Sequence, residues 1–157
     1  MFSFMKKERI LSNVANGRII SLTKVPDEVF SKKILGDGFA VIPTNGNIYS
    51  PSDGTVTDVT DSLHAYCITT DDGLEILVHI GIDTVELKGE CFTPLVKQGD
   101  KIKRGEALAY ADIEGIHEKG YNSTTMVVIT NTEKLSEYKI HEVQSEAAGT
   151  PALTYKL

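Results

Sequence analysis

The amino-acid sequence predicts an all-β fold, a sandwich or barrel of many short strands. Turn signals rich in glycine recur about every ten residues, from "NG" at 16–17 to "AAGT" at 147–150. Short apolar or β-branched runs lie between these signals, which is typical of β-sandwiches and β-barrels. Helical periodicity is weak along the chain, so helices are expected only as short turns.

Each expected strand is a run of about five residues bounded by turn signals. In chain order the runs cover residues 18–22, 38–42, 55–59, 65–69, 75–80, 106–111, 125–130 and 152–157. Two segments, 26–35 and 132–140, have the spacing for one or two helical turns. The segment "VKQGDKIKRGEALAYA" resembles the half-motif of lipoyl and biotinyl carrier domains, but the carrier lysine tip is absent. The resemblance implies a related β-architecture without a swinging arm.

The length of 157 residues is that of one domain with a substantial core. We expect this domain to cover residues 9–157 and residues 1–8 to form a flexible N-terminal tail. In that tail apolar residues precede the lysines, the reverse of a secretory signal. No apolar run approaches the ~18 residues needed to cross a bilayer.

The formal net charge of -6, without a basic stripe, argues against nucleic acid as the partner. An acidic chain would suit a partner with a basic docking face. Cys67 and Cys91 show neither CxxC spacing nor a disulfide framework. Without an export signal, we interpret both as reduced thiols of a cytoplasmic protein.

The segment "HAYCITTDDGLEILVH" reads as a β-hairpin with His64 and His79 at its ends. A two-residue turn at 71–72 would place the histidines directly opposite each other, with Cβ atoms ~4.5–5.5 Å apart. A turn at 72–73 would place them diagonally, ~7–8 Å apart on the same face. A three-residue loop would put them on opposite faces. Two of the three simplest turns therefore bring the imidazoles together.

The run "EILVHIGID" is nearly continuous apolar sequence, so its histidine is expected to be partly buried. Burial favours the neutral imidazole, which is both a nucleophile and a metal ligand. Two adjacent imidazoles fit a phosphorylatable pair, half of a metal site or a structural hydrogen-bonded pair. Ser62 precedes His64 by two residues, and strand alternation would place its hydroxyl on the same face. A simple turn serine is the other interpretation of Ser62.

Several segments together resemble the glucose-type enzyme IIA component of the bacterial sugar phosphotransferase system. They are "VPDEVFSKKILGDGFAVIP", "SPSDGTV", "LHAYCI" and "VHIGIDTVELKGECF", in the expected order and spacing. The resemblance covers nearly the whole chain. It implies a compact antiparallel β-sandwich of the barrel-sandwich, duplicated-hybrid-motif type.

The resemblance also implies a division of roles at the histidine pair. His79 would be phosphorylated on Nε2, and His64 would stabilise the phosphoryl group by hydrogen bonding. Ser62 occupies a position that is usually threonine in the family, so the hydroxyl is kept. Asp27 and Asp83 resemble acidic positions that meet basic residues of the phosphoryl donor.

The implied partners are the phosphocarrier HPr and the enzyme IIB domain of a sugar permease, whose cysteine would receive the phosphate. The residues that resemble the docking surface are Val29, Phe30, Ile34, Leu35 and Leu77, although spacing alone would assign them to the core. The resemblance implies a monomer without its own cofactor, which reaches the membrane only through the permease. His64 and His79 would share a zinc ion only with a carboxylate from a partner.

Two other functions fit parts of the sequence. A zinc-dependent hydrolase is one, because "HIGID" has an H-x3-D spacing that zinc peptidases of a related β-fold use. Those enzymes also need an H-x-H motif, which this chain lacks, and three protein ligands for the metal. A regulatory module of the same fold, which binds permeases or sugar kinases when unphosphorylated, is the other.

Overall fold

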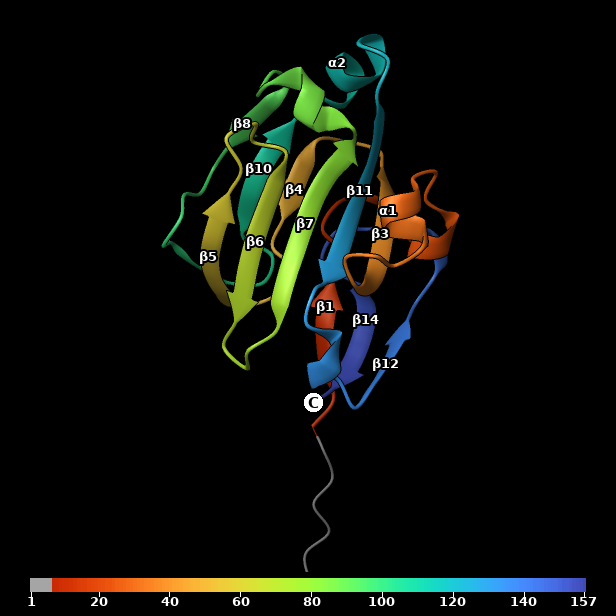
Figure 1. Cartoon of the computed structure of the whole chain (residues 1–157), viewed down its shortest axis with the longest axis vertical. Helices are drawn as coiled ribbons and strands as arrows, with labels where there is room; N and C mark the ends of the chain where they lie inside the picture. The colour runs from red at the N-terminus through yellow and green to blue at the C-terminus, as the bar shows by residue number, and fades with distance from the viewer. Residues whose placement is uncertain (1–6) are drawn as a thin grey trace, which may run out of the picture.

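The structure, a computed structural model, describes residues 7–157, so most of the expected N-terminal tail lies outside the described residues. Short strands make up most of it (Figure 1). They are β1 (Arg9–Ser12), β2 (Gly17–Ser21), β3 (Asp37–Pro43), β4 (Asn47–Tyr49), β5 (Gly54–Val59), β6 (Ala65–Thr70), β7 (Glu75–Ile82), β8 (Phe92–Pro94), β9 (Lys101–Ile102), β10 (Ala107–Ala111), β11 (Asn122–Ile129), β12 (Glu137–Ile140), β13 (Val143–Glu146) and β14 (Pro151–Lys156). The helical elements are η1 (Leu22–Lys24), α1 (Glu28–Ser31), η2 (Thr84–Leu87), α2 (Ile113–Glu118) and η3 (Thr132–Lys134).

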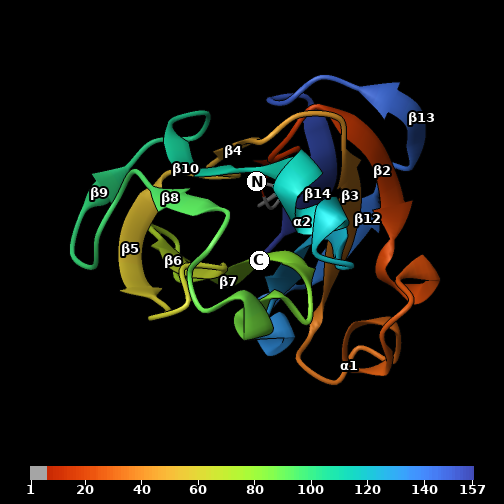
Figure 2. The same ribbon diagram turned by 90° about the horizontal axis from the view of Figure 1, so that it is seen from above.

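The strands form one eight-stranded sheet, in the order β13-β2-β3-β11-β7-β6-β5-β9, and two three-stranded sheets, β1-β14-β12 and β4-β10-β8. Each pairing between these strands is antiparallel. Seen from above, the large sheet curves around and the small sheets close the opposite side (Figure 2). The expected all-β antiparallel sandwich is confirmed.

The inner face of the large sheet carries the main core. Phe39, Tyr66, Val78 and Val127 lie on neighbouring strands of this sheet, and all are fully buried. They pack with Leu108 of the β4-β10-β8 sheet in the same cluster. Burial of this apolar surface is the main favourable contribution to folding.

The outer face carries a second, smaller apolar cluster that lies beneath η1 and α1. It contains Ile20, Leu22, Val25, Phe30, Ala40, Ile82, Met126 and Val128. Asp27 starts α1 as its N-cap, because its Oδ1 accepts the Val29 N–H at 2.9 Å. The segment that covers the outer face is therefore held in place both by a polar cap and by apolar burial.

The helical elements agree only in part with the sequence-based expectations. The helical turn within 26–35 is confirmed as α1, but 132–140 forms only η3 before continuing as strand β12. Helix α2 was not expected; Asp112 caps it by accepting the Gly115 N–H at 3.0 Å, and Ile116 is buried. Among residues 7–157, no helix has the length and apolar character needed to span a membrane.

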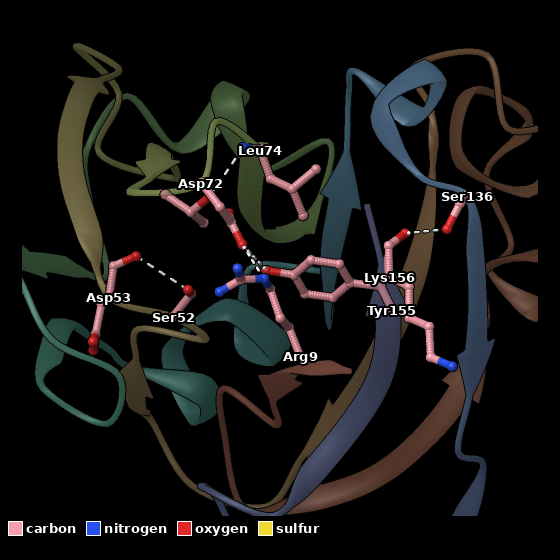
Figure 3. A network of polar contacts seen from close by, with 9 residues as sticks. Arg9, Ser52, Asp53, Asp72, Leu74, Ser136, Tyr155 and Lys156 are labelled. Carbon is pink, nitrogen blue, oxygen red and sulfur yellow. Dashed lines mark hydrogen bonds and ion pairs between the residues drawn. The ribbon is translucent and has the colours of Figure 1, made fainter. Parts of the chain in front are cut away.

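A polar cluster holds the β6–β7 hairpin against the β1-β14-β12 sheet. Arg9 and Tyr155 both point to Asp72 in the hairpin loop (Figure 3). Arg9 Nε lies 3.1 Å from Asp72 Oδ2, and the Tyr155 hydroxyl donates to the same oxygen at 3.0 Å. The hydroxyl of Thr70 also donates to Asp72. These contacts, which join distant parts of the chain, fix the end of the hairpin remote from His79.

Candidate active site

His79 lies on β7, near the middle of the large sheet. It pairs directly with Ala65 on β6 and Met126 on β11. Directly opposed residues share a face, so His79 points to the outer face, where α1 covers part of it. The ring of Phe30 packs against the imidazole with a centroid distance of 5.0 Å. His79 is therefore half-buried between the sheet and α1.

A hydrogen bond fixes the tautomer of His79. Its Nδ1 lies 2.8 Å from the carbonyl oxygen of Gly81, which can only accept a proton. Nδ1 therefore carries the proton, and the neutral ring has its free lone pair on Nε2. Gly81 has φ +83°, and an added Cβ would lie 2.3 Å from Thr84 Cγ2. The backbone that presents this carbonyl is thus suited to glycine.

Burial, and after it the nearby His64, lowers the pKa of His79 to about 4. The bond to the Gly81 carbonyl, Asp27 and Asp83 act in the opposite direction and are outweighed. The imidazole is consequently neutral at pH 7. A neutral ring with a lone pair on Nε2 is a competent nucleophile.

The turn between the histidines is the three-residue loop, so both two-residue turns considered from the sequence are wrong. Ala65 pairs with His79 and Thr69 with Glu75, and the backbone of Thr70 and Leu74 closes the loop. Gly73 has φ +92°, as expected for the last residue of a three-residue hairpin loop. By strand alternation alone, this register would place the two histidines on opposite faces of the sheet.

His64 nevertheless meets His79, because it precedes β6 and belongs to the β5–β6 loop. Leu63 has φ +61°, a left-handed conformation that redirects the chain just before His64. The His64 and His79 ring centroids lie 4.8 Å apart, and the rings are nearly perpendicular at 82°. Burial lowers the pKa of His64 as well. The expected contact is therefore present, but it arises from the loop and not from the hairpin register.

The hydroxyl beside His64 belongs to Thr60. Its Oγ1 lies 3.3 Å from His64 Nδ1. Ser62 lies in the turn of the β5–β6 loop, so the strand alternation that suggested its position does not apply. Sequence reasoning missed Thr60 because four residues separate it from His64, and only the loop between them brings the two side chains together. The role of Ser62 toward a phosphoryl group stays a prediction.

Asp27 and Asp83 both lie near His79, and their charges raise its pKa against the effect of burial. Asp27 is half-buried as the N-cap of α1. Asp83 is exposed and has φ +59° at the start of η2. The expected acidic pair is thus placed beside the histidines.

The predicted docking residues divide by exposure. Val29, Ile34 and Leu35 are exposed at 42%, 65% and 41%, and Leu77 is half-buried. Phe30 is only 6% exposed and packs against His79, so its side chain belongs to the apolar cluster on the outer face, and its docking role stays a prediction. Val85 on η2, two residues after Asp83, adds an exposed apolar side chain that the sequence analysis did not select.

Within residues 7–157, no group of three or more His, Cys, Asp or Glu side chains could hold a metal ion. The H-x3-D spacing of His79 and Asp83 thus gains no third ligand in the described part of the chain. His117 and His141 bond to Ser123 and Thr154 and take no part in the pair.

Comparisons with known proteins agree on one family. The family model for the phosphoenolpyruvate-dependent sugar phosphotransferase system, EIIA 1, matches residues 9–135. The glucose-specific EIIA component of Oceanobacillus iheyensis is 46% identical over 85% of this chain and 81% of that protein. That of Halalkalibacterium halodurans is 38% identical over 94% of this chain and 85% of that protein.

This chain is also similar to part of a longer relative and to a solved structure. The glucose-specific EIICBA component of Streptococcus pneumoniae is 44% identical over 92% of this chain, which spans only 20% of that longer protein. The structure of glucose permease IIA from Mycoplasma capricolum matches with a TM-score of 0.83 and 32% identity, covering 97% of this chain and 99% of that one.

The curved β-sandwich with a neutral histidine pair on its outer face defines a class of phosphoryl-carrying domains. The chain belongs to the EIIA 1 family of the phosphoenolpyruvate-dependent sugar phosphotransferase system. It is a phosphocarrier of sugar transport. Neither the hydrolase nor the purely regulatory alternative is favoured by these relatives.

Proposed function

We propose that His79 is the residue that carries the phosphoryl group, bonded through Nε2. The observation that supports this most strongly is the bond from His79 Nδ1–H to the Gly81 carbonyl, which leaves the lone pair on Nε2. The low pKa keeps that lone pair free at pH 7. In the transfer, the Nε2–P bond forms as the phosphorus–nitrogen bond of phospho-HPr breaks.

His64 would stabilise the phosphoryl oxygens. Its ring stands nearly perpendicular to that of His79, at a centroid distance of 4.8 Å. An N–H aimed at the transferring group stabilises negative charge best when it is fixed in advance in a partly buried site. Ser62 lies in the same loop, and its hydroxyl remains the predicted second hydrogen-bond donor to the phosphoryl group, after His64.

The surface around the pair would bind two partners in turn, HPr and the enzyme IIB domain of a sugar permease. Exposed Val29, Ile34 and Leu35, with half-buried Leu77, provide a non-directional apolar surface. Asp27 and Asp83 provide negative charge for a basic donor. The IIB cysteine sulfur would form a bond to phosphorus as the His79 Nε2–P bond breaks.

The chain would act in the cytoplasm as a monomer without its own cofactor. His64 and His79 offer two imidazoles to a zinc ion, to which a partner would add a carboxylate. The specificity for the sugar would belong to the permease.

The proposal can be tested by incubating the chain with phosphoenolpyruvate, enzyme I and HPr and measuring its intact mass. We expect one added phosphate, labile in acid and stable in base, which His79→Ala abolishes. His64→Gln should still accept phosphate but pass it on slowly to a IIB domain. His141→Ala is the matched control, because its ring bonds to Thr154 away from the pair.

Phosphate uptake by His79→Ala at the wild-type rate would show that the acceptor is another residue. Metal-dependent peptidase activity without phosphate uptake would instead support the hydrolase alternative.

A further inference from the structure

The β5–β6 loop places the hydroxyl of Thr60 beside Nδ1 of the His64 ring. Thr60 Oγ1 lies 3.3 Å from His64 Nδ1. The loop itself fixes this position, because the Thr60 N–H donates to the Ala65 carbonyl at 3.1 Å. The Ala65 N–H in turn donates to Thr60 Oγ1 at 3.2 Å. Ala65 therefore holds both the backbone and the hydroxyl oxygen of Thr60.

The proton of this hydroxyl has two acceptors within reach, His64 Nδ1 at 3.3 Å and the Ala65 carbonyl at 3.4 Å. The Ala65 carbonyl already accepts the Thr60 N–H, and the Ala65 N–H already occupies one lone pair of the hydroxyl oxygen. His64 Nδ1 is the nearer of the two acceptors and has no other hydrogen bond among the described residues. Donation to His64 gives Nδ1 its hydrogen bond, whereas donation to the Ala65 carbonyl would add a second bond to an oxygen that already accepts one.

We propose that Thr60 is a positioning residue that holds neutral His64 with its proton on Nε2. The hydroxyl donates to Nδ1, so Nδ1 must be unprotonated and the ring proton must sit on Nε2. The Gly81 carbonyl imposes the opposite arrangement on His79. The two adjacent imidazoles are thereby fixed as different tautomers, one with a free lone pair on Nε2 and the other with an N–H there.

This inference rests on the proposed function for its role in phosphoryl transfer. With the proton on Nε2, His64 donates to a phosphoryl oxygen carried by His79. With the proton on Nδ1, His64 would turn a lone pair toward the same negative oxygens. Thr60 thus acts through His64, and its loss should weaken the stabilisation of the phosphoryl group without removing the nucleophile.

The tautomer can be measured directly in the unphosphorylated protein by 15N NMR of the histidine ring nitrogens at neutral pH. We expect His64 in the wild type to show a pyridine-like Nδ1 and a pyrrole-like Nε2. Thr60→Val should shift both signals toward averaging between tautomers, and Thr60→Ser should restore the wild-type pattern. His79 should keep its own tautomer in all three proteins. This readout needs no partner, so it tests Thr60 even if the proposed phosphoryl transfer fails.

Kinetics give the second readout. In Thr60→Val we expect onward transfer to a IIB domain to slow about fivefold to tenfold, the loss expected for one hydrogen bond. Phosphate acceptance from phospho-HPr should change less, and Thr60→Ser should recover both rates. Thr57→Val is the matched control, since Thr57 is an exposed threonine of the preceding strand whose hydroxyl donates to the Cys67 carbonyl at 3.3 Å.

An unchanged His64 tautomer in a folded Thr60→Val protein would overturn the proposal. So would a pyrrole-like Nδ1 of His64 in the wild type, because the hydroxyl would then accept and not donate. A change of tautomer in Ser62→Ala, with none in Thr60→Val, would assign the role to Ser62 instead.

Discussion

At the scale of single residues, the site depends on where each imidazole proton is held. The Gly81 carbonyl holds the His79 proton on Nδ1, and burial keeps Nε2 free of a second proton. Leu63 and Asp83, which flank the pair in sequence, both have left-handed backbone conformations. Such conformations are uncommon for residues other than glycine and concentrate at functional sites. Local backbone geometry therefore creates the chemistry as much as the side chains do.

The low pKa of His79 predicts the pH dependence of both activity and stability. Phosphate acceptance should be independent of pH above about pH 5.5 and fall as pH approaches 4, when Nε2 becomes protonated. The folded pKa lies below the ordinary value of 6.5, so the unfolded chain binds this proton first as pH falls. The free energy of unfolding should therefore decrease as the pH falls from 6.5 to about 4.

NMR titration of the His79 ring and urea denaturation across this pH range measure the two effects. His79→Asn should lose that part of the pH dependence of stability. A His79 pKa near 6.5 would contradict both the effect assigned to burial and the proposal that burial keeps Nε2 unprotonated.

Gly81→Ala should damage both stability and transfer. An alanine there adopts an unfavourable positive φ, which costs about 1–2 kcal/mol, and its Cβ would also lie 3.0 Å from the Asn122 carbonyl oxygen and closer to Thr84. Gly99→Ala is the matched control, because Gly99 has φ +96° but nothing within 4 Å of an added Cβ. Thermal denaturation should show the larger loss for Gly81→Ala, and only that variant should slow phosphate acceptance. Equal losses would mean that the contacts around Gly81 are unimportant.

At the scale of elements, α1 and the turn after it carry the residues of the proposed docking surface, and a buried carboxylate anchors them. Asp37 is 6% exposed and accepts the Gly38 N–H at 2.8 Å. Lys33 Nζ lies 3.2 Å from Asp37 Oδ2, and the hydroxyl of Tyr138 on β12 donates to the same oxygen. The turn that presents Ile34 is thus tied to a strand from the other end of the chain.

Tyr138→Phe should loosen this turn. Loss of a hydrogen bond to a buried carboxylate costs about 1.5–3 kcal/mol. Hydrogen exchange of the Lys33 and Ile34 amides, which bond to the Phe30 and Val29 carbonyls, should become faster. The KM for phospho-HPr should rise while kcat stays close to wild type. Tyr110→Phe, at another exposed tyrosine, is the control and should change neither the amide exchange nor the KM. Unchanged amide exchange in Tyr138→Phe would show that the bond from Tyr138 to Asp37 does not hold this turn.

The limits of sequence-based prediction also lie at this scale. Strand runs such as 75–80 were predictable, because period and turn chemistry are local properties. The contact of His64 with His79 was expected for the wrong reason, since alternation along a strand cannot describe a loop residue after a left-handed Leu63. Thr60 was missed for the same reason. The burial of Phe30 could not be decided from the sequence, because tertiary packing determines which residues of a short helix face the sheet.

At the scale of the whole molecule, the small β1-β14-β12 sheet closes the fold on the side away from the histidine pair. The β1-β14-β12 sheet packs into the main core through Leu11, Leu153 and Tyr155. It also holds the remote end of the β6–β7 hairpin through Asp72. Because β7 carries His79, the closure of the fold and the position of the His79 side chain are connected along one strand.

Tyr155→Phe should lower stability without affecting the chemistry of the distant pair. Its hydroxyl donates to Asp72, and we expect a loss of about 1.5–3 kcal/mol, or roughly 3–12 °C in Tm for a chain of this size. Tyr66→Phe is the matched control, since the buried Tyr66 hydroxyl has no hydrogen-bond partner among residues 7–157. That control should be neutral or stabilising. Equal destabilisation by both variants would contradict the role given to Asp72.

The central claim is that the geometry makes His79 Nε2 the acceptor of the phosphoryl group. The most direct test is 15N NMR of the uniformly labelled chain after phosphorylation through enzyme I and HPr, with phosphorus coupling read at each histidine nitrogen. We predict a single coupled nitrogen, Nε2 of His79, with His79 Nδ1 still protonated. Coupling at Nδ1, or at any nitrogen of His64, would contradict the account.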